Sequence, residues 1–246
     1  MDALGTIEEI WRYPVSSLGG ERLTSVELGA DGIAGDRSWC VVDATTGQPA
    51  APEKEERWRA AVFLQSRLTD NTPDIGFPDG TWLSVLDEGL CSKLSDHFGF
   101  DVAAWPYAKA GAELSDTRAV AVNRYEPSPL HLITTSALDH LSALIGTEKV
   151  QSKRFRPNIV VRTTGEADFR EKAWLGKRLQ LGSSVIHIGE ETKRCGLTLI
   201  AQPDVSENPE ILRSILRQNR RNFGVYASIE TIGTISTGDR ADLIDA

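Results

Sequence analysis

Short apolar segments closed by glycine turns constrain this chain more than any other feature. The clearest is the alternating run from Leu179 to Ile188, which predicts a β-hairpin. Other short strand-forming runs lie at 7–13, 23–28, 38–42, 225–229, 232–235 and 241–244. Glycine turns separate them, for example at Gly29–Gly32 and Gly238–Asp239. Many short strands with tight turns are typical of a barrel-like β core.

Three segments have a helical period instead. Leu90, Leu94 and Phe98 recur every four residues before Gly99, and Cys91 beside them is expected to be a core residue. The segment 136–145 has a capping box at Ser136 and ends at Gly146, and a third helix is expected to begin at Asn208–Pro209. The expected fold class is therefore α+β and strand-rich, with a β-barrel core and helical additions.

Composition bounds the partners and the compartment. With 246 residues, 40% hydrophobic and 25% charged, the chain can form one large globular domain or two intimate ones. Its net charge of −8 argues against nucleic acid or an acidic membrane as the main partner. No apolar stretch approaches the ~20 residues of a membrane span, and Asp2, Glu8 and Glu9 do not fit a signal segment. We therefore expect a cytoplasmic protein without a membrane partner.

Cys195 is the residue with the clearest chemical potential. The three cysteines, 40, 91 and 195, lack disulfide-framework spacing, and the four histidines form no zinc motif. Cys195 follows Lys193 and Arg194, and an electropositive setting favours the thiolate that attacks electrophiles and binds soft metals. The alternative is a buried cysteine that acts as a small hydrophobe. The local sequence leaves both open.

Several motifs, in order over most of the chain, resemble those of a known family. The C-terminal motifs resemble the MOSC domain, named after the C-terminal domain of molybdenum cofactor sulfurases: Arg156–Val161, Phe169–Trp174, Gly182, Arg194–Cys195, Asn222–Tyr226 and Gly238–Asp239. Upstream, Tyr13–Ser17, Gly32–Arg37 and Trp39–Asp43 resemble the N-terminal β-barrel domain that often precedes it. The resemblance implies an N-terminal domain over 1–115 and a MOSC domain over 116–246.

The resemblance implies an oxidoreductase that binds the molybdenum cofactor (Mo-molybdopterin) and is independent of pyridoxal phosphate. In the amidoxime-reducing branch the cysteine that matches Cys195 is the catalytic residue and the metal ligand, and the pterin lies between the two domains. The substrate would be a small N-hydroxylated compound. Electrons would come from a separate donor protein, because three dispersed cysteines cannot hold an iron–sulfur cluster.

Two other functions fit the same cysteine. In carrier-type members it is proposed to hold sulfur as a persulfide, which also requires a thiolate. A divergent enzyme could instead keep the fold and use Cys195, without molybdenum, on a small anionic substrate.

The resemblance also implies cofactor-binding residues. Arg156 and Asn158 match an Arg-Pro-Asn motif that faces the cofactor pocket, where an arginine suits a phosphate and an asparagine suits pterin edges. Arg194 and Phe223 belong to matching motifs. Thr134, Thr135 and Ser136 open a predicted helix, and a helix start with hydroxyls is a ready anion site. The structural alternatives are a salt bridge for Arg156, a turn cap for Asn158, and helix capping for the three hydroxyls.

Two positions depart from the family pattern. Ser16 stands where cofactor-binding members have a lysine, and 50–58 lacks the expected arginine, with Lys54 or Arg57 as possible substitutes. The charged run from Glu53 to Arg59 is expected to be an exposed connection. Each lost charge-assisted contact is worth about 1.5–3 kcal/mol, so the departures would weaken cofactor binding by orders of magnitude.

Overall fold

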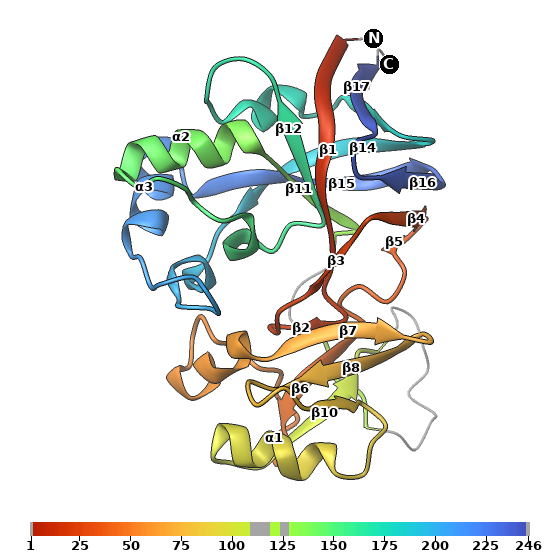
Figure 1. Ribbon diagram of the computed structural model, residues 1–246, viewed down its shortest axis with the longest axis vertical. Helices are drawn as coiled ribbons and strands as arrows, with labels where there is room; N and C mark the ends of the chain where they lie inside the picture. Colours follow the sequence, from red (N-terminus) through yellow and green to blue (C-terminus); the bar gives the residue numbers. More distant parts are fainter. Residues whose placement is uncertain (1, 109–118, 124–127, 245–246) are drawn as a thin grey trace. The chain divides into compact units, whose positions relative to one another are not determined.

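The computed structural model describes residues 2–108, 119–123 and 128–244, which form two compact units (Figure 1). The barrel unit comprises residues 1–11, 22–34 and 128–246, and the second unit comprises 12–21 and 35–127. The division in space therefore does not follow a single cut in the sequence. The expected boundary between 115 and 116 lies outside the described residues.

Seven strands of the barrel unit close into a barrel. Its order is β12 (Ile159–Thr163), β11 (Leu130–Thr134), β15 (Asn222–Thr231), β14 (Ser184–Lys193), β13 (Arg178–Leu181), β17 (Arg240–Ile244) and β1 (Asp2–Arg12). The ring closes because β1 pairs with both β17 and β12. Only the β11–β12 pair is parallel among these described strands. Between Leu179 and Ile188, alternate side chains of the β13–β14 strands are buried, the apolar ones in the barrel core. The closed ring of strands confirms the strand-rich, barrel-based fold class.

Smaller strands and two helices complete the barrel unit. β3 (Glu21–Leu23) pairs with β1, and β16 (Gly233–Ser236), β4 (Ser25–Gly29) and β5 (Gly32–Ile33) form a three-stranded sheet. α2 (Thr135–Ile145) and α3 (Glu210–Asn219) pack on each other over a second apolar cluster. Short 3₁₀ turns lie at η2 (Ser152–Phe155), η3 (Arg170–Trp174) and η4 (Gly196–Leu199).

The helix ends mostly follow the sequence signals. α2 begins one residue earlier than predicted, because the Thr134 hydroxyl, and not Ser136, accepts the capping bond from Ala137 N. It ends at Gly146, which has the left-handed φ of 66° that favours glycine. The Asn208 side chain accepts from Glu210 N at the start of α3, as its position suggests.

The second unit has its own core around Trp58. β10 (Val102–Pro106), β6 (Trp39–Asp43) and β2 (Val15–Ser16) form one sheet, and β7 (Gln65–Thr69), β8 (Thr72–Gly76) and β9 (Trp82–Ser84) form another. α1 (Leu90–Phe98) and η1 (Glu56–Phe63) pack with them. The Trp58 ring makes edge contacts with Phe98 and Phe100 at centroid distances of 5.1 and 4.8 Å.

Two sequence predictions in this unit are wrong. The run from Glu53 to Arg59 is not simply an exposed connection, because η1 begins within it and Trp58 is fully buried. Cys91 is exposed, although it was expected in the core. Leu90 and Leu94, four residues apart, form the buried face of α1, and Cys91, the residue after Leu90, points away from that face. Cys40, on β6, is buried.

Candidate functional site

Cys195 occupies the turn between β14 and η4. Its thiol is half-buried and forms no disulfide. Its carbonyl oxygen accepts from the backbone nitrogen of Thr198 at 3.3 Å and from the Thr198 hydroxyl at 3.0 Å. The turn therefore satisfies its own backbone and leaves the sulfur as its chemically available group.

Arg194 turns its side chain into the protein. Its Nη2 donates to the carbonyl of Phe155 at 2.7 Å, and its guanidinium carbon lies 5.6 Å from the centre of the Phe155 ring. Lys193, by contrast, is exposed. The two cations that precede Cys195 in the sequence thus lie in different environments, and Arg194 connects the cysteine turn to the end of η2.

His131 connects the residues of the predicted site, although the sequence analysis assigned it no role. It is buried on β11, with Nε2 3.3 Å from Nη1 of Arg194 and Nδ1 3.5 Å from the carbonyl of Arg156. Because a guanidinium only donates, we assign the ring proton to Nδ1, and Nε2 accepts. A histidine between apolar strand residues was the only local signal, because its partners lie 25 residues or more away in the sequence.

Gly224 makes room for this histidine. Its φ is +81°, and a Cβ there would lie 2.7 Å from His131 Nε2 and 2.5 Å from the carbonyl oxygen of Leu132. A side chain at this position would therefore displace the ring or the strand.

Asn158 joins two strands of the barrel. It is 1% exposed, and its Oδ1 accepts from His131 N at 3.0 Å while its Nδ2 donates to the carbonyl of Trp11 at 3.4 Å. These contacts support the structural role that the sequence left open. Arg156 is half-buried and directly follows η2 with φ 52°, so its carbonyl faces His131.

The start of α2 already holds a carboxyl group. Oε1 of Glu171 accepts from both the backbone nitrogen and the hydroxyl of Thr134, each at 2.9 Å. Glu171 is 2% exposed, and burial raises the pKa of its carboxyl to about 7. The chain thus supplies its own acidic group at the place where the sequence suggested an external anion.

The two neighbouring hydroxyls anchor the loop before η3. The Ser136 hydroxyl accepts from Asp168 N at 2.9 Å and lies 3.0 Å from the carbonyls of Glu166 and Asp168. The Thr135 hydroxyl accepts from Thr163 N at 3.2 Å. These bonds support the capping and anchoring alternative, and a phosphate contact by these residues stays a prediction.

Phe223 packs in the core. It is fully buried, and its ring stacks on Phe155 with centroids 3.9 Å apart. The structure therefore brings Arg156, Asn158 and Arg194 around His131, with Phe223 packed below them on Phe155.

The departures from the family pattern lie in the second unit. Ser16, on β2, pairs with Cys40 of β6. Arg57 forms ion pairs with Asp43 at 2.8 Å and Glu55 at 2.9 Å, and its guanidinium lies over the Phe100 ring. Arg57 is therefore engaged within its own unit, which does not favour it as a substitute cofactor contact.

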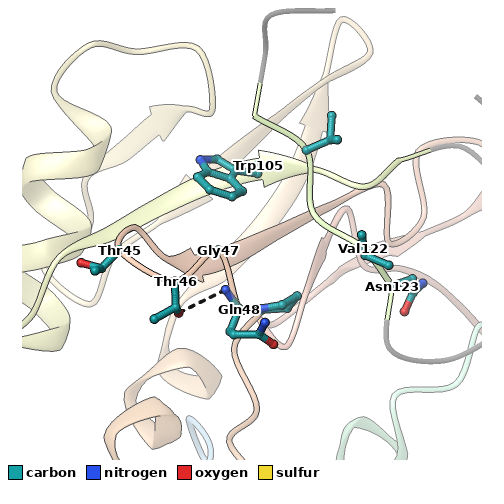
Figure 2. Close-up of a pocket in the computed structure, with 9 residues that line it drawn as sticks. Thr45, Thr46, Gly47, Gln48, Trp105, Val122 and Asn123 are labelled. Atoms are coloured by element: carbon teal, nitrogen blue, oxygen red, sulfur yellow. Dashed lines mark hydrogen bonds between the residues drawn. The ribbon is translucent and has the colours of Figure 1, made fainter. Parts of the chain in front are cut away.

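A hollow of about 620 Å³ in the second unit has a different chemistry. Figure 2 shows the Trp105 ring and the Thr45–Gln48 loop on one side and Val122 and Asn123 on the other. All nine of its lining residues are uncharged, and none is a cysteine or a histidine. Its described lining therefore offers none of the charged, cysteine or histidine side chains that metal, redox or acid–base chemistry uses, and Cys195 remains the candidate reactive residue.

Comparisons with known proteins identify the family. The family described as MOSC domain matches residues 116–242, and the one described as MOSC N-terminal beta barrel domain matches residues 4–61. The chain belongs to the MOSC family.

Curated relatives and one solved structure extend this finding. Mitochondrial amidoxime reducing component 2 is 28% identical in Rattus norvegicus and 33% in Macaca fascicularis, over 97% of this chain and 83% of each relative. Human molybdenum cofactor sulfurase is 22% identical over 91% of this chain but only 30% of its own length. The YUAD protein of Bacillus subtilis shares the fold at a TM-score of 0.50, with 11% identity over 96% of this chain and 93% of that protein. At the family level, the function of this MOSC protein is therefore related to the molybdenum cofactor.

The residues around Cys195 fit a group that is both metal-containing and anionic. Among the described residues no three His, Cys, Asp or Glu side chains gather as metal ligands, so a metal at this turn would have the thiolate as its protein ligand. Arg154, on η2, is 4% exposed and donates to the carbonyls of Thr198 and Ser206. No carboxylate in the described part of the chain pairs with it, its Nε is buried without a partner there, and burial lowers its pKa. An anion beside this turn would offset that charge.

None of the helices in the described ranges is both long and apolar enough to cross a membrane.

Proposed function

We propose that this MOSC protein binds the molybdenum cofactor with Cys195 Sγ as the metal ligand and reduces N-hydroxylated small molecules. The names of the amidoxime reducing components, similar over 97% of the chain, support the reaction class. Cleavage of an N–O bond of this kind takes up two electrons and two protons and releases water. The bound cofactor would supply the two-electron chemistry, and a separate donor protein would supply the electrons.

The observation that carries the proposal is a half-buried cysteine in a turn that Thr198 connects to a buried arginine, Arg154, which has no carboxylate partner among the described residues. Cys195 O bonds to Thr198, and the Thr198 carbonyl in turn accepts from Arg154. The Thr198 carbonyl thus links the Arg154 guanidinium to the turn that carries the sulfur, and an anionic ligand bound there would offset this charge.

Other residues have supporting roles in this proposal. We assign Arg156 to the cofactor phosphate, because a guanidinium can bind it with two parallel bonds. The polar atoms of Asn158, Thr134, Thr135 and Ser136 already bond within the protein, so their roles are to hold the strands and loops that carry the site.

A sulfur-carrier function is the second candidate. It is favoured by Ser16 in place of a lysine and by the engagement of Arg57 with Asp43 and Glu55, which leave fewer cations for a cofactor. The likeness to molybdenum cofactor sulfurase supports the same choice. A persulfide on Cys195 would use the same thiolate and need no metal.

Metal analysis of protein from a cofactor-competent host tests the proposal. Wild-type protein should contain molybdenum and reduce an amidoxime when electrons are supplied, and Cys195→Ser should abolish the reduction. Arg156→Ala should lower molybdenum occupancy, and Ser16→Lys should raise the affinity about tenfold or more, the value of one charge-assisted contact.

Two results would decide against the molybdenum proposal. One is that wild-type protein contains no molybdenum and that the Ser16→Lys variant contains none either. The other is sulfur released from Cys195 by cyanide in metal-free protein, which indicates the carrier. The amidoxime-reducing relatives are named as mitochondrial, and the cytoplasmic location expected from the sequence stays a prediction.

A further inference from the structure

We infer that Arg221 is a positioning residue for Cys195, because its main chain and its side chain together clasp the peptide that leads into the thiol. What the sulfur is positioned for, a metal or a persulfide, rests on the function proposed above. The clasp itself is independent of that choice.

The clasp consists of two reciprocal hydrogen bonds. Arg194 N donates to the carbonyl of Arg221 at 2.9 Å, and Nε of Arg221 donates to the carbonyl of Arg194 at 2.5 Å. The β14–β15 ladder ends one step earlier, at the pair Lys193 and Asn222. Arg221 therefore extends the ladder by one residue pair. The Arg194 carbonyl accepts from the Arg221 side chain, where a regular antiparallel pair would use the backbone nitrogen of residue 221. Because the Arg194 carbonyl belongs to the same planar peptide as the Cys195 nitrogen, the bond fixes the approach to the cysteine.

The opposite side of the same segment is also held. The Arg194 guanidinium donates to the Phe155 carbonyl at 2.7 Å, and the Cys195 carbonyl accepts from Thr198. With these groups in place, the Arg221 bonds complete the restraint on residues 194 and 195. The half-buried sulfur is the part of this segment that remains to react.

Arg220 and Arg221 are both exposed and share one backbone conformation, but they differ in their side-chain contacts. Arg220 and Arg221 follow α3 with φ of 51° and 75°, in the left-handed region that glycine and asparagine prefer. Arg220 is exposed, and its side chain makes no hydrogen bond or ion pair with the described residues. Glycine would relieve the backbone at either position, but only at 221 would it remove the donor to Arg194. This difference provides a matched pair of variants.

The experiment compares Arg221→Gly with Arg220→Gly in protein without molybdenum. Hydrogen exchange of the peptide 193–197 reports the clasp, and iodoacetamide labelling of Cys195 relative to Cys91 reports the thiol. Cys91 is exposed on α1, in the other unit, and serves as the internal reference. We expect about tenfold faster local exchange in Arg221→Gly, because a hydrogen bond from a charged donor is worth about that factor. The labelling ratio should rise as the turn opens, and the melting temperatures of the two variants should be similar.

Equal local exchange and equal labelling in the two glycine variants would overturn the inference. If Arg221→Gly does not fold, Arg221→Met keeps the apolar stem, lacks the donor and permits the same comparison. The clasp stands, and the proposed function fails, if wild-type protein never contains molybdenum while Arg221→Gly still shows the faster exchange.

Discussion

Replacement of Glu171 by glutamine should remove a pH dependence of stability from the barrel unit. The Glu171 carboxyl is buried at the start of α2, where Oε1 accepts two bonds from Thr134. Burial raises its pKa from the ordinary 4.5 to about 7, and the nearby Asp168 adds to the effect. A glutamine has nearly the same shape, keeps the accepting oxygen and never ionises.

The sign and size follow from linkage. Between pH 4.5 and 7 the unfolded chain ionises this group while the folded protein keeps it neutral, so its contribution is fully present below 4.5 and is lost as pH rises to about 7. The difference between 4.5 and about 7, at 1.36 kcal/mol per pH unit, corresponds to about 3 kcal/mol. Glu171→Gln should therefore match wild type near pH 4.5 and exceed its stability by up to about 3 kcal/mol above pH 7.

Native-state hydrogen exchange of β11 and β15 amides at several pH values measures this quantity for the barrel unit alone. Glu166→Gln is the control, because it removes an exposed carboxyl from the neighbouring loop. The same pH slope in Glu171→Gln and wild type would refute the reasoning, as would a variant that is less stable at every pH.

Four further outcomes follow from particular contacts. Gly224→Ala should destabilise the barrel unit by more than about 2 kcal/mol in urea unfolding, because its Cβ would meet the Leu132 carbonyl, whereas Gly238→Ala, with open space around it, should cost only about 1 kcal/mol. Thr134→Val should cost about 1–3 kcal/mol through the lost cap and the loss of one of the two bonds to Glu171 Oε1, and Thr134→Ser should retain most of the stability. Cys40 should resist iodoacetamide until the second unit unfolds, as mass spectrometry of the alkylated peptides will show. Hydrogen bonds from Thr46 and Arg57 hold the pKa of Asp43 below 3.8, and the hydrogen bond from Lys93 does the same for Asp79. The stability that these two carboxylates contribute should therefore be lost as the pH falls below about 4. In acid titration, Asp79→Asn should lose less stability than wild type.

Local signals in the sequence predicted many of the elements and the candidate reactive residue. Alternation in 179–188 predicted the β13–β14 hairpin, and glycines after Phe98 and Ile145 predicted two helix ends, because strand period and left-handed termini depend on neighbouring residues alone. The family motifs likewise lie in a fixed order along the chain, so the MOSC assignment could be made without coordinates. The role of Cys195 stays a prediction.

The tertiary structure alone decided which polar groups are already satisfied. Helix period placed Cys91 in the core, but the packing of α1 left it exposed. The sequence offered Thr134 as an anion contact and gave no role to His131, Glu171 or Arg221, whose partners lie 25 to 92 residues away. A hydrogen bond between such distant residues depends on which strands pair, here β11 with β15 and β15 with β14, and a local pattern contains no information about those pairings.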